Sequence, residues 1–401
     1  MSKQTTALLL SAKIRSMLRQ RLFVVLALPL LFATIVTGCY TSLFSFGDSL
    51  ADTGNLYFIS PPQSPDCLIP PYGQTHFHHP NGRCSDGRLI LDFVAESLGL
   101  PYVKPYLGFK NGVVKRKNIQ QGVNFAVAGA TALGRRFFEE KGFTVDVTAN
   151  FSLKVQLDWF KELLPSFCNS SSRCKHVLRS SLFIVGEIGG NDYGFPLSVT
   201  TAFEDLVTYV PQVVSVITSA IRELIDLGAV TFIVPGSLPL GCNPAYLTEF
   251  ATTDKEEYDH DGCLKWLNRF YESHNELLQI ELNRLRVLYP HTNIIYADYF
   301  HAALLLYDSP EHYGFGGNVL KVCCGGGGPY NYNETAKCGD AGVIACDDPT
   351  QYVSWDGYHF TEAAYRWMTK ALLDGPYTFP KFNISCFAAE ITEDLNNHVM
   401  K

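Results

Sequence analysis

The chain has 401 residues, of which 47% are hydrophobic, and this length and composition suffice for a large buried core. The formal net charge is −7 at pH 7, and lysine and arginine do not cluster beyond residues 115–117. A mildly acidic chain without an extended basic surface is not expected to bind nucleic acid.

Residues 1–38 are predicted to be a signal peptide. Basic residues precede an apolar run over 22–36, and small residues follow it, which is the order of a secretory signal. These basic residues are Lys13, Arg15, Arg19 and Arg21. A signal anchor is the alternative, but the run is short for a membrane span, which needs about 20 apolar residues. We therefore expect residues 39–401 to form one soluble domain, secreted or vacuolar, with no stable membrane span after cleavage.

The chain contains twelve cysteines, a number that fits an oxidising compartment. Cys67 and Cys84 flank a Pro- and His-rich loop, and Cys168 and Cys174 flank a short polar segment predicted to be a loop. Later cysteines are Cys242, Cys263, Cys323, Cys324, Cys338, Cys346 and Cys386. We expect disulfides that tether long loops, with the pairing left open. A zinc site in the late group is the alternative; the spacings do not match zinc-ligand pairs, so no metal or other cofactor is expected.

Four asparagines stand two residues before serine or threonine, in the pattern of N-glycosylation acceptors. They are Asn150, Asn169, Asn333 and Asn383. Behind a signal peptide, these sites are predicted to carry glycans.

From residue 43 onward, short apolar strands alternate with amphipathic helices. The predicted strands are residues 43–46, 123–127, 182–185, 230–234 and 293–297. The predicted helices are residues 86–98, 153–164, 203–227, 262–288, 299–306 and 361–373. Such alternation predicts an α/β fold, a three-layer α/β/α sandwich around a five-stranded parallel sheet. Residues 59–83 and 311–349 interrupt the pattern and are predicted to be long, disulfide-tethered loops.

A serine follows the first strand in the sequence Gly47-Asp48-Ser49. It stands at the carboxyl edge of the predicted sheet, where open α/β folds bind ligands. Taken alone, Ser49 is better explained as a turn or helix-capping residue. The second and third strands, however, end near Gly129 and Asn191, so all three residues are expected at one sheet edge.

Asp356 and His359 precede the last helix with a spacing of three residues. Asp-x-x-His on a turn lets the carboxylate reach Nδ1 of the imidazole while Nε2 faces outward, as a general base for a serine requires. We therefore predict Ser49 as the nucleophile, His359 as the base and Asp356 as the residue that orients it. The predicted oxyanion donors are the Ser49 and Gly129 backbone N–H groups and the Asn191 side-chain amide.

Four stretches of the chain resemble the conserved blocks of the GDSL esterase/lipase family, the SGNH hydrolases. Residues 46–55 resemble the first block, 124–130 the second, 189–193 the third and 355–359 the fifth. The plant branch of the family is suggested by residues 235–242 and 323–330. Within that branch, the chain is most similar to the group that contains sinapine esterase and acetylajmalan esterase.

The resemblance implies a flavodoxin-like three-layer fold and hydrolysis of carboxylic esters, small-molecule or lipid, through an acyl-enzyme. Ser49 does not lie in a Gly-x-Ser-x-Gly sequence, which argues against an ordinary α/β-hydrolase. One alternative is acyl transfer to an acceptor other than water at the same site. Another is an inactive secreted binding protein, although binding alone does not need all five predicted site residues. The sequence leaves the oligomeric state open.

Overall fold

The computed structural model describes residues 40–59, 67–199, 203–316 and 319–383, which belong to one compact unit. The predicted signal peptide and Cys386 lie outside the described residues. Within the described ranges, no helix combines the length and the apolar character needed to cross a bilayer.

A seven-stranded sheet forms the centre of the fold. Its strands are β1 (Ser42–Ser45), β2 (Lys104–Pro105), β3 (Gly122–Asn124), β4 (Ser181–Ile184), β5 (Thr231–Pro235), β6 (Asn293–Ala297) and β7 (Thr378–Phe379). The order is β2-β3-β1-β4-β5-β6-β7, and every pair is parallel except β6 with β7. The prediction of five strands was wrong by two, because β2 and β7 are two-residue edge strands, too short to show a hydrophobic period.

Helices cover the sheet. The α-helices are α2 (Ile90–Ser97), α3 (Tyr106–Lys110), α4 (Arg135–Glu140), α5 (Leu153–Leu163), α6 (Ser171–Arg179), α7 (Gly190–Leu197), α8 (Phe203–Val207), α9 (Val210–Leu227), α10 (Pro244–Glu249), α11 (Lys265–Leu288), α12 (Tyr299–Asp308) and α13 (Glu362–Asp374). Short 3-10 turns are Leu56–Phe58, Arg116–Asn118, Val147–Phe151, Leu164–Ser166, Leu240–Cys242, Lys255–Glu257, Pro310–Tyr313 and Pro349–Gln351.

The long helix predicted over 203–227 is divided into α8 and α9. Pro211 is the second residue of α9. A proline lacks the N–H for a helical hydrogen bond and its ring clashes with the carbonyl four residues earlier, so it starts a helix rather than continuing one. The segment between Cys168 and Cys174, predicted as a loop, contains the start of α6.

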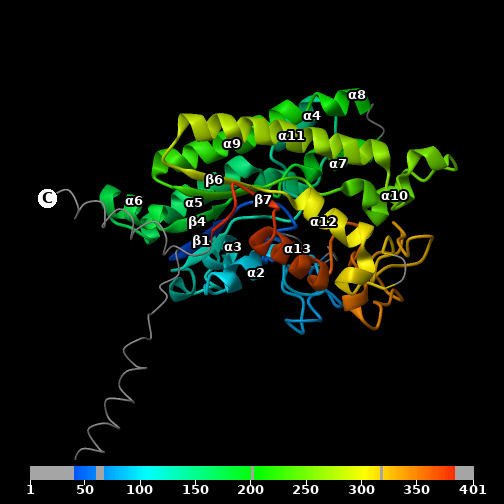
Figure 1. Cartoon of the computed structure of the whole chain (residues 1–401). Helices are drawn as coiled ribbons and strands as arrows, with labels where there is room; N and C mark the ends of the chain where they lie inside the picture. Colours follow the sequence, from blue (N-terminus) through cyan, green and yellow to red (C-terminus); the bar gives the residue numbers. More distant parts are fainter. Residues whose placement is uncertain (1–39, 60–66, 200–202, 317–318, 384–401) are drawn as a thin grey trace, which may run out of the picture. The chain divides into compact units, whose positions relative to one another are not determined.

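The helices lie on both faces of the sheet, which confirms the three-layer prediction. Figure 1 shows α9 and α11 on one side of the strands and α2 and α13 on the other. On the first side, Phe44 of β1 packs its ring 5.3 Å from Phe160 of α5 and 5.3 Å from Phe183 of β4. On the second side, α13 packs against α2 and α12. Burial of these aromatic side chains between the sheet and the helices stabilises the layers.

Among the described residues, five disulfides link segments of the chain, which confirms the prediction of disulfide bonds. The pairs are Cys67–Cys84, Cys168–Cys174, Cys242–Cys263, Cys323–Cys346 and Cys324–Cys338. The last two lie in the Gly- and Cys-rich segment that leads to Asp356 and His359. They limit the freedom of this segment, which has no helix over the described residues 319–348.

The topology brings three strand ends to one place. Because β3, β1 and β4 are parallel neighbours, their carboxyl ends share an edge of the sheet. Gly129 and Ser49 lie in the turns that follow β3 and β1, and Asn191 is the second residue of α7, which follows β4. The sheet therefore positions all three residues before any side-chain interaction is considered.

Candidate active site

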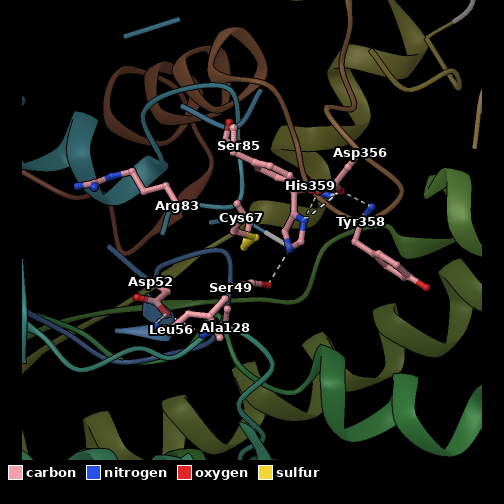
Figure 2. The surroundings of a disulfide bond; sticks show 12 residues. Ser49, Asp52, Leu56, Cys67, Arg83, Ser85, Ala128, Asp356, Tyr358 and His359 are labelled. Atoms are coloured by element: carbon pink, nitrogen blue, oxygen red, sulfur yellow. Dashed lines mark hydrogen bonds and ion pairs between the residues drawn. A yellow bond between two sulfur atoms is a disulfide. The ribbon is translucent and has the colours of Figure 1, made fainter. Parts of the chain in front are cut away.

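Ser49, Asp356 and His359 form a continuous hydrogen-bonded chain (Figure 2). The Nε2 atom of His359 lies 2.8 Å from the Oγ atom of Ser49, a residue 310 positions earlier in the chain. The Nδ1 atom of the same ring lies 2.8 Å from Oδ2 of Asp356 and 3.0 Å from Oδ1. In this arrangement the imidazole can accept the serine proton while the carboxylate stabilises the imidazolium that results.

The Asp356 carboxylate is held in place by groups other than His359. Its Oδ1 atom accepts the backbone N–H groups of Tyr358 and His359, both at 2.7 Å, and its Oδ2 atom accepts the Tyr72 hydroxyl at 2.8 Å. Burial alone would raise the pKa of Asp356, but the His359 charge and these hydrogen bonds outweigh it and hold that pKa below its ordinary value. Asp356 therefore stays ionised near neutral pH, as an orienting residue must.

Tyr72 is a site residue that the sequence did not reveal. It lies in the Pro- and His-rich loop that the Cys67–Cys84 disulfide closes, and Figure 2 shows Cys67 close to Ser49 and His359. No local spacing links Tyr72 with Asp356, which lies 284 residues later. The role of Tyr72 therefore becomes visible only in the folded structure, where its hydroxyl reaches Asp356.

The turn before Ser49 depends on Gly47 and on Gln156 of α5. Gly47 has φ +146°, and a Cβ atom there would lie 2.5 Å from the Gly186 carbonyl oxygen, so only glycine fits. The Gln156 side chain accepts the Gly47 N–H at 2.9 Å and donates to the Gly47 carbonyl at 2.8 Å. Its helical spacing with Leu153 and Leu157 places Gln156 on the apolar face of α5, which the sequence could have shown, but the sequence does not identify Gly47 as its partner.

The predicted oxyanion donors follow strands that end at the same edge of the sheet. Among the described residues, the backbone N–H groups of Ser49 and Gly129 donate to no other group. Gly129 has φ +78° and packs so closely on Thr148 that an added Cβ would lie 2.4 Å from its Oγ1. The Asn191 amide nitrogen donates to the Ala130 carbonyl at 2.9 Å and lies 3.4 Å from Oδ2 of Asp48. One amide proton is therefore used in the hydrogen bond to Ala130. The other makes only the long contact to Asp48, so a substrate oxygen could replace that contact.

Three buried carboxyl groups accept backbone hydrogen bonds from the segments around the predicted site. Asp52 accepts backbone N–H groups from Gly54, Asn55, Leu56 and Ala128 at 2.6–3.0 Å. Asp192 accepts the N–H groups of Ala132 and Leu133, both at 2.8 Å, and Asp48 accepts that of Leu50 at 3.1 Å. Burial raises the pKa of Asp48 and of Asp192 to about 7 and that of Asp52 to about 6, although the hydrogen bonds act in the opposite direction.

These raised pKa values predict a fold that is more stable at pH 6 than at pH 8. An aspartate in an unfolded chain titrates near about 3.9, so between these pH values the folded state binds protons that the unfolded state has lost. Stability then falls as pH rises through about 7. Burial lowers the pKa of His274 to about 4, which destabilises the fold as pH falls below about 6.5 and opposes the trend only weakly in this window.

Thermal unfolding of the purified protein at pH 6, 7 and 8 checks this expectation. The Asp192→Asn variant removes one titrating group but keeps a hydrogen-bond acceptor, so it is expected to show a smaller difference between pH 6 and pH 8. A melting temperature that is equal or higher at pH 8 would contradict the prediction.

One group of described side chains could together ligate a metal ion. The ligand atoms of Asp259, His260 and Asp261 lie within 4.8 Å of one another. Asp259 already accepts the N–H groups of Asp261 and Cys263, at 3.0 and 2.9 Å, as an ordinary acidic turn does. We assign no metal to this turn, and the serine chemistry described above requires none.

Comparisons with known proteins agree with this geometry. The sequence profile of the GDSL-like lipase/acylhydrolase family matches residues 43–372. A GDSL esterase/lipase of Arabidopsis thaliana is 51% identical over 371 residues, 91% of this chain and 93% of the relative. A second one is 53% identical over 373 residues, with the same coverage. The sinapine esterase of Brassica napus is 51% identical over 356 residues, 87% of this chain and 89% of that protein. The chain therefore belongs to the GDSL-like lipase/acylhydrolase family, and by that membership it is an ester hydrolase.

Proposed function

We propose that this protein is a secreted serine esterase that hydrolyses carboxylic esters through an acyl-enzyme on Ser49. The observation that carries the proposal is the hydrogen-bonded chain from Ser49 through His359 to Asp356. The Ser49 Oγ atom attacks the ester carbonyl carbon as its proton passes to Nε2 of His359. The developing oxyanion then receives hydrogen bonds from the Ser49 and Gly129 N–H groups and from the Asn191 amide.

The second half of the reaction uses the same imidazole. His359 gives its proton to the oxygen of the departing alcohol, and the acyl group stays on Ser49. A water molecule then loses a proton to His359 and attacks the acyl carbon, which releases the acid and returns the proton to Ser49. Because the base must be neutral to act, we expect the rate to rise as pH increases through the His359 titration.

Labelling with a fluorophosphonate tests the nucleophile directly. We expect one equivalent of the probe to attach to Ser49, as found by mass spectrometry of proteolytic peptides, with parallel loss of p-nitrophenyl acetate hydrolysis. Stoichiometric labelling of a different serine, or hydrolysis that survives complete labelling, would show that the proposed mechanism is wrong. Because the Brassica napus relative is named a sinapine esterase, sinapine is a first natural ester to include.

Replacing Asn191 by alanine is expected to lower kcat on p-nitrophenyl acetate by about 10²–10³-fold, with a much smaller change in KM. The reason is that the amide donates to the oxygen only when charge develops on it in the transition state. Steady-state kinetics of the purified variant measure both constants. If KM rises while kcat is unchanged, Asn191 contributes to substrate binding and is not an oxyanion donor.

Secretion is supported by the five disulfides and by the pattern of residues 1–38. The predicted glycosylation sites Asn150, Asn169 and Asn383 are exposed, and Asn333 is partly buried. Expression of the full chain in a eukaryotic secretory host tests both predictions. We expect a mature N-terminus near residue 39 and a mass that falls on treatment with an N-glycosidase; an intact N-terminus on a cell-associated protein would contradict cleavage.

A further inference from the structure

One oxygen of the Asp356 carboxylate is shared between the imidazole of His359 and a residue from a distant loop. Its Oδ2 atom lies 2.8 Å from Nδ1 of His359 and also accepts the Tyr72 hydroxyl at 2.8 Å. Its Oδ1 atom accepts two backbone N–H groups, both at 2.7 Å. Among the described residues, His359 and Tyr72 are the two side chains that hydrogen-bond to this carboxylate. Tyr72 therefore competes with the imidazole for its negative charge.

The packing around Tyr72 maintains this contact. Tyr72 is buried, its ring meets that of Trp355 edge to face at 5.9 Å, and its backbone N–H donates to the Ile69 carbonyl at 3.2 Å. Trp355 is fully buried and directly precedes Asp356 in the chain. Water does not readily replace a buried hydrogen bond from a hydroxyl to a carboxylate, so the contact is stronger here than it would be on the surface.

The loop that carries Tyr72 is also joined to the chain directly after His359. The backbone N–H of Gly73 donates to the Ser85 carbonyl at 2.9 Å, and the Ser85 hydroxyl donates to the Phe360 carbonyl at 2.9 Å. Ser85 is fully buried, so both hydrogen bonds are shielded from water. Ser85 thus links the residue after Tyr72 to the residue after His359, and the two side chains keep a fixed relation to each other.

Two carboxyl groups act on His359: Asp356 on its own turn and Asp48 on the turn after β1. Asp48 in turn lies within electrostatic range of Glu187 and Asp192, which follow β4. A substitution in the loop of residues 67–86 leaves all four carboxyl groups in place.

The other titratable groups around the triad add no charge beside Asp356. Burial raises the pKa of the tyrosines that interact with Asp356 or His359, so these tyrosines stay neutral near pH 7: Tyr332, Tyr358 and Tyr365. Arg83, in the same loop as Tyr72, pairs with Asp92 at 2.7 Å. Among the described residues, no lysine or arginine forms an ion pair with Asp356. The Asp356 charge is therefore balanced by His359 and by hydrogen bonds.

We propose that Tyr72 is a positioning residue that acts on His359 through Asp356 and extends ester hydrolysis to lower pH. This inference rests on the proposed function, since it takes His359 as the base. The hydroxyl holds Oδ2 in place beside Nδ1, and it also neutralises part of the carboxylate charge that favours the imidazolium. The imidazole therefore stays neutral, and able to accept the Ser49 proton, in more acidic surroundings than it would beside an unshared carboxylate.

The Tyr72→Phe variant keeps the ring against Trp355 and removes the hydroxyl. We expect the midpoint on the acid side of its kcat/KM profile for p-nitrophenyl acetate to rise by about half a pH unit, a loss of about threefold at acidic pH. At higher pH, where the imidazole is neutral, the loss is expected to stay within about tenfold, because Asp356 keeps its two backbone hydrogen bonds. A midpoint that is unchanged or lower, including an equal loss at every pH, would overturn the proposal.

Two further variants assign the shift to the hydroxyl of Tyr72. Tyr102 donates its hydroxyl to Glu96 and lies 3.2 Å from Nε2 of His76, in the same loop as Tyr72, so Tyr102→Phe removes the same chemistry from another carboxylate. It is expected to leave the midpoint unchanged, and an equal shift in this control would overturn the proposal. Replacing Tyr72 by 3-fluorotyrosine preserves the packing and supplies a more acidic hydroxyl, which donates a stronger hydrogen bond. The midpoint is then expected to fall; if it does not, the proposal is wrong even where Tyr72→Phe fails to fold.

Titration of the imidazole without turnover separates this proposal from the hydrolytic one. In the Ser49→Ala variant labelled with ¹⁵N-histidine, NMR follows the His359 signal, which is identified by its loss on adding His359→Gln. Adding Tyr72→Phe instead is expected to raise the pH of half-titration of His359 by about half a unit. An unchanged half-titration, together with ester hydrolysis by the wild type, would refute the role of Tyr72 and leave the esterase proposal intact. A raised half-titration in a protein whose wild type hydrolyses no ester would refute the esterase proposal alone.

Discussion

Replacing Ser49 by alanine is expected to lower kcat on p-nitrophenyl acetate by about 10⁶-fold, the size found when the nucleophile of a serine hydrolase is removed. The Ser49 hydroxyl forms the bond to the acyl carbon, and its Oγ atom lies 2.8 Å from Nε2 of His359, which takes its proton. The oxyanion donors remain in the variant, so a small residual rate above that of water is expected. Labelling by the fluorophosphonate is expected to disappear completely.

The fold of the Ser49→Ala variant is expected to survive. Among the described residues, the only side-chain hydrogen bond of Ser49 is that to His359, so its melting temperature is expected to lie close to that of the wild type. Ser172→Ala, an exposed serine on α6, is the matched control and is expected to retain full activity. If Ser49→Ala is folded and keeps more than a few per cent of the wild-type kcat, Ser49 is not the nucleophile.

Replacing Asp356 by asparagine is expected to lower kcat by about 10⁴-fold, the loss seen when the triad aspartate of a serine protease becomes asparagine. The structure explains which way the new amide would face. The Asp356 Oδ1 atom accepts two backbone N–H groups at 2.7 Å, so the amide oxygen takes that position. The NH₂ group then faces Nδ1 of His359 and donates to it. The imidazole proton moves to Nε2, which can no longer accept a proton from Ser49.

The chain itself provides a control for the Asp356→Asn variant. Asp298 and His301 repeat the Asp-x-x-His pattern on the protein surface, with Nδ1 2.8 Å from Oδ2. Asp298→Asn changes the same chemistry away from Ser49 and is expected to leave kcat unchanged. Both variants are measured on p-nitrophenyl acetate across the pH range. An Asp356→Asn enzyme within tenfold of the wild type at every pH would show that the orienting role is wrong.

Some features of this protein follow from the sequence by itself. β6 occupies the predicted residues 293–297, because a buried parallel strand is a short, continuous apolar run that ends at turn residues. The turn that joins Asp356 to His359 is also local, since three residues suffice for the carboxylate to reach both backbone N–H groups and Nδ1. The position of Ser49 at the carboxyl edge of the sheet could also be predicted, because the alternation of strands and helices indicates a parallel sheet.

Other features were decided only by the tertiary structure. Tyr72 meets Asp356 across 284 residues, and Gln156 meets Gly47 across 109, with no periodic signal in the sequence to connect them. The disulfide pairing and the edge strands β2 and β7 were likewise decided by contacts between segments far apart in the sequence. Strands and turns depend on the hydrophobic period and local geometry of a few residues, whereas these contacts depend on which distant segments the packed core brings together.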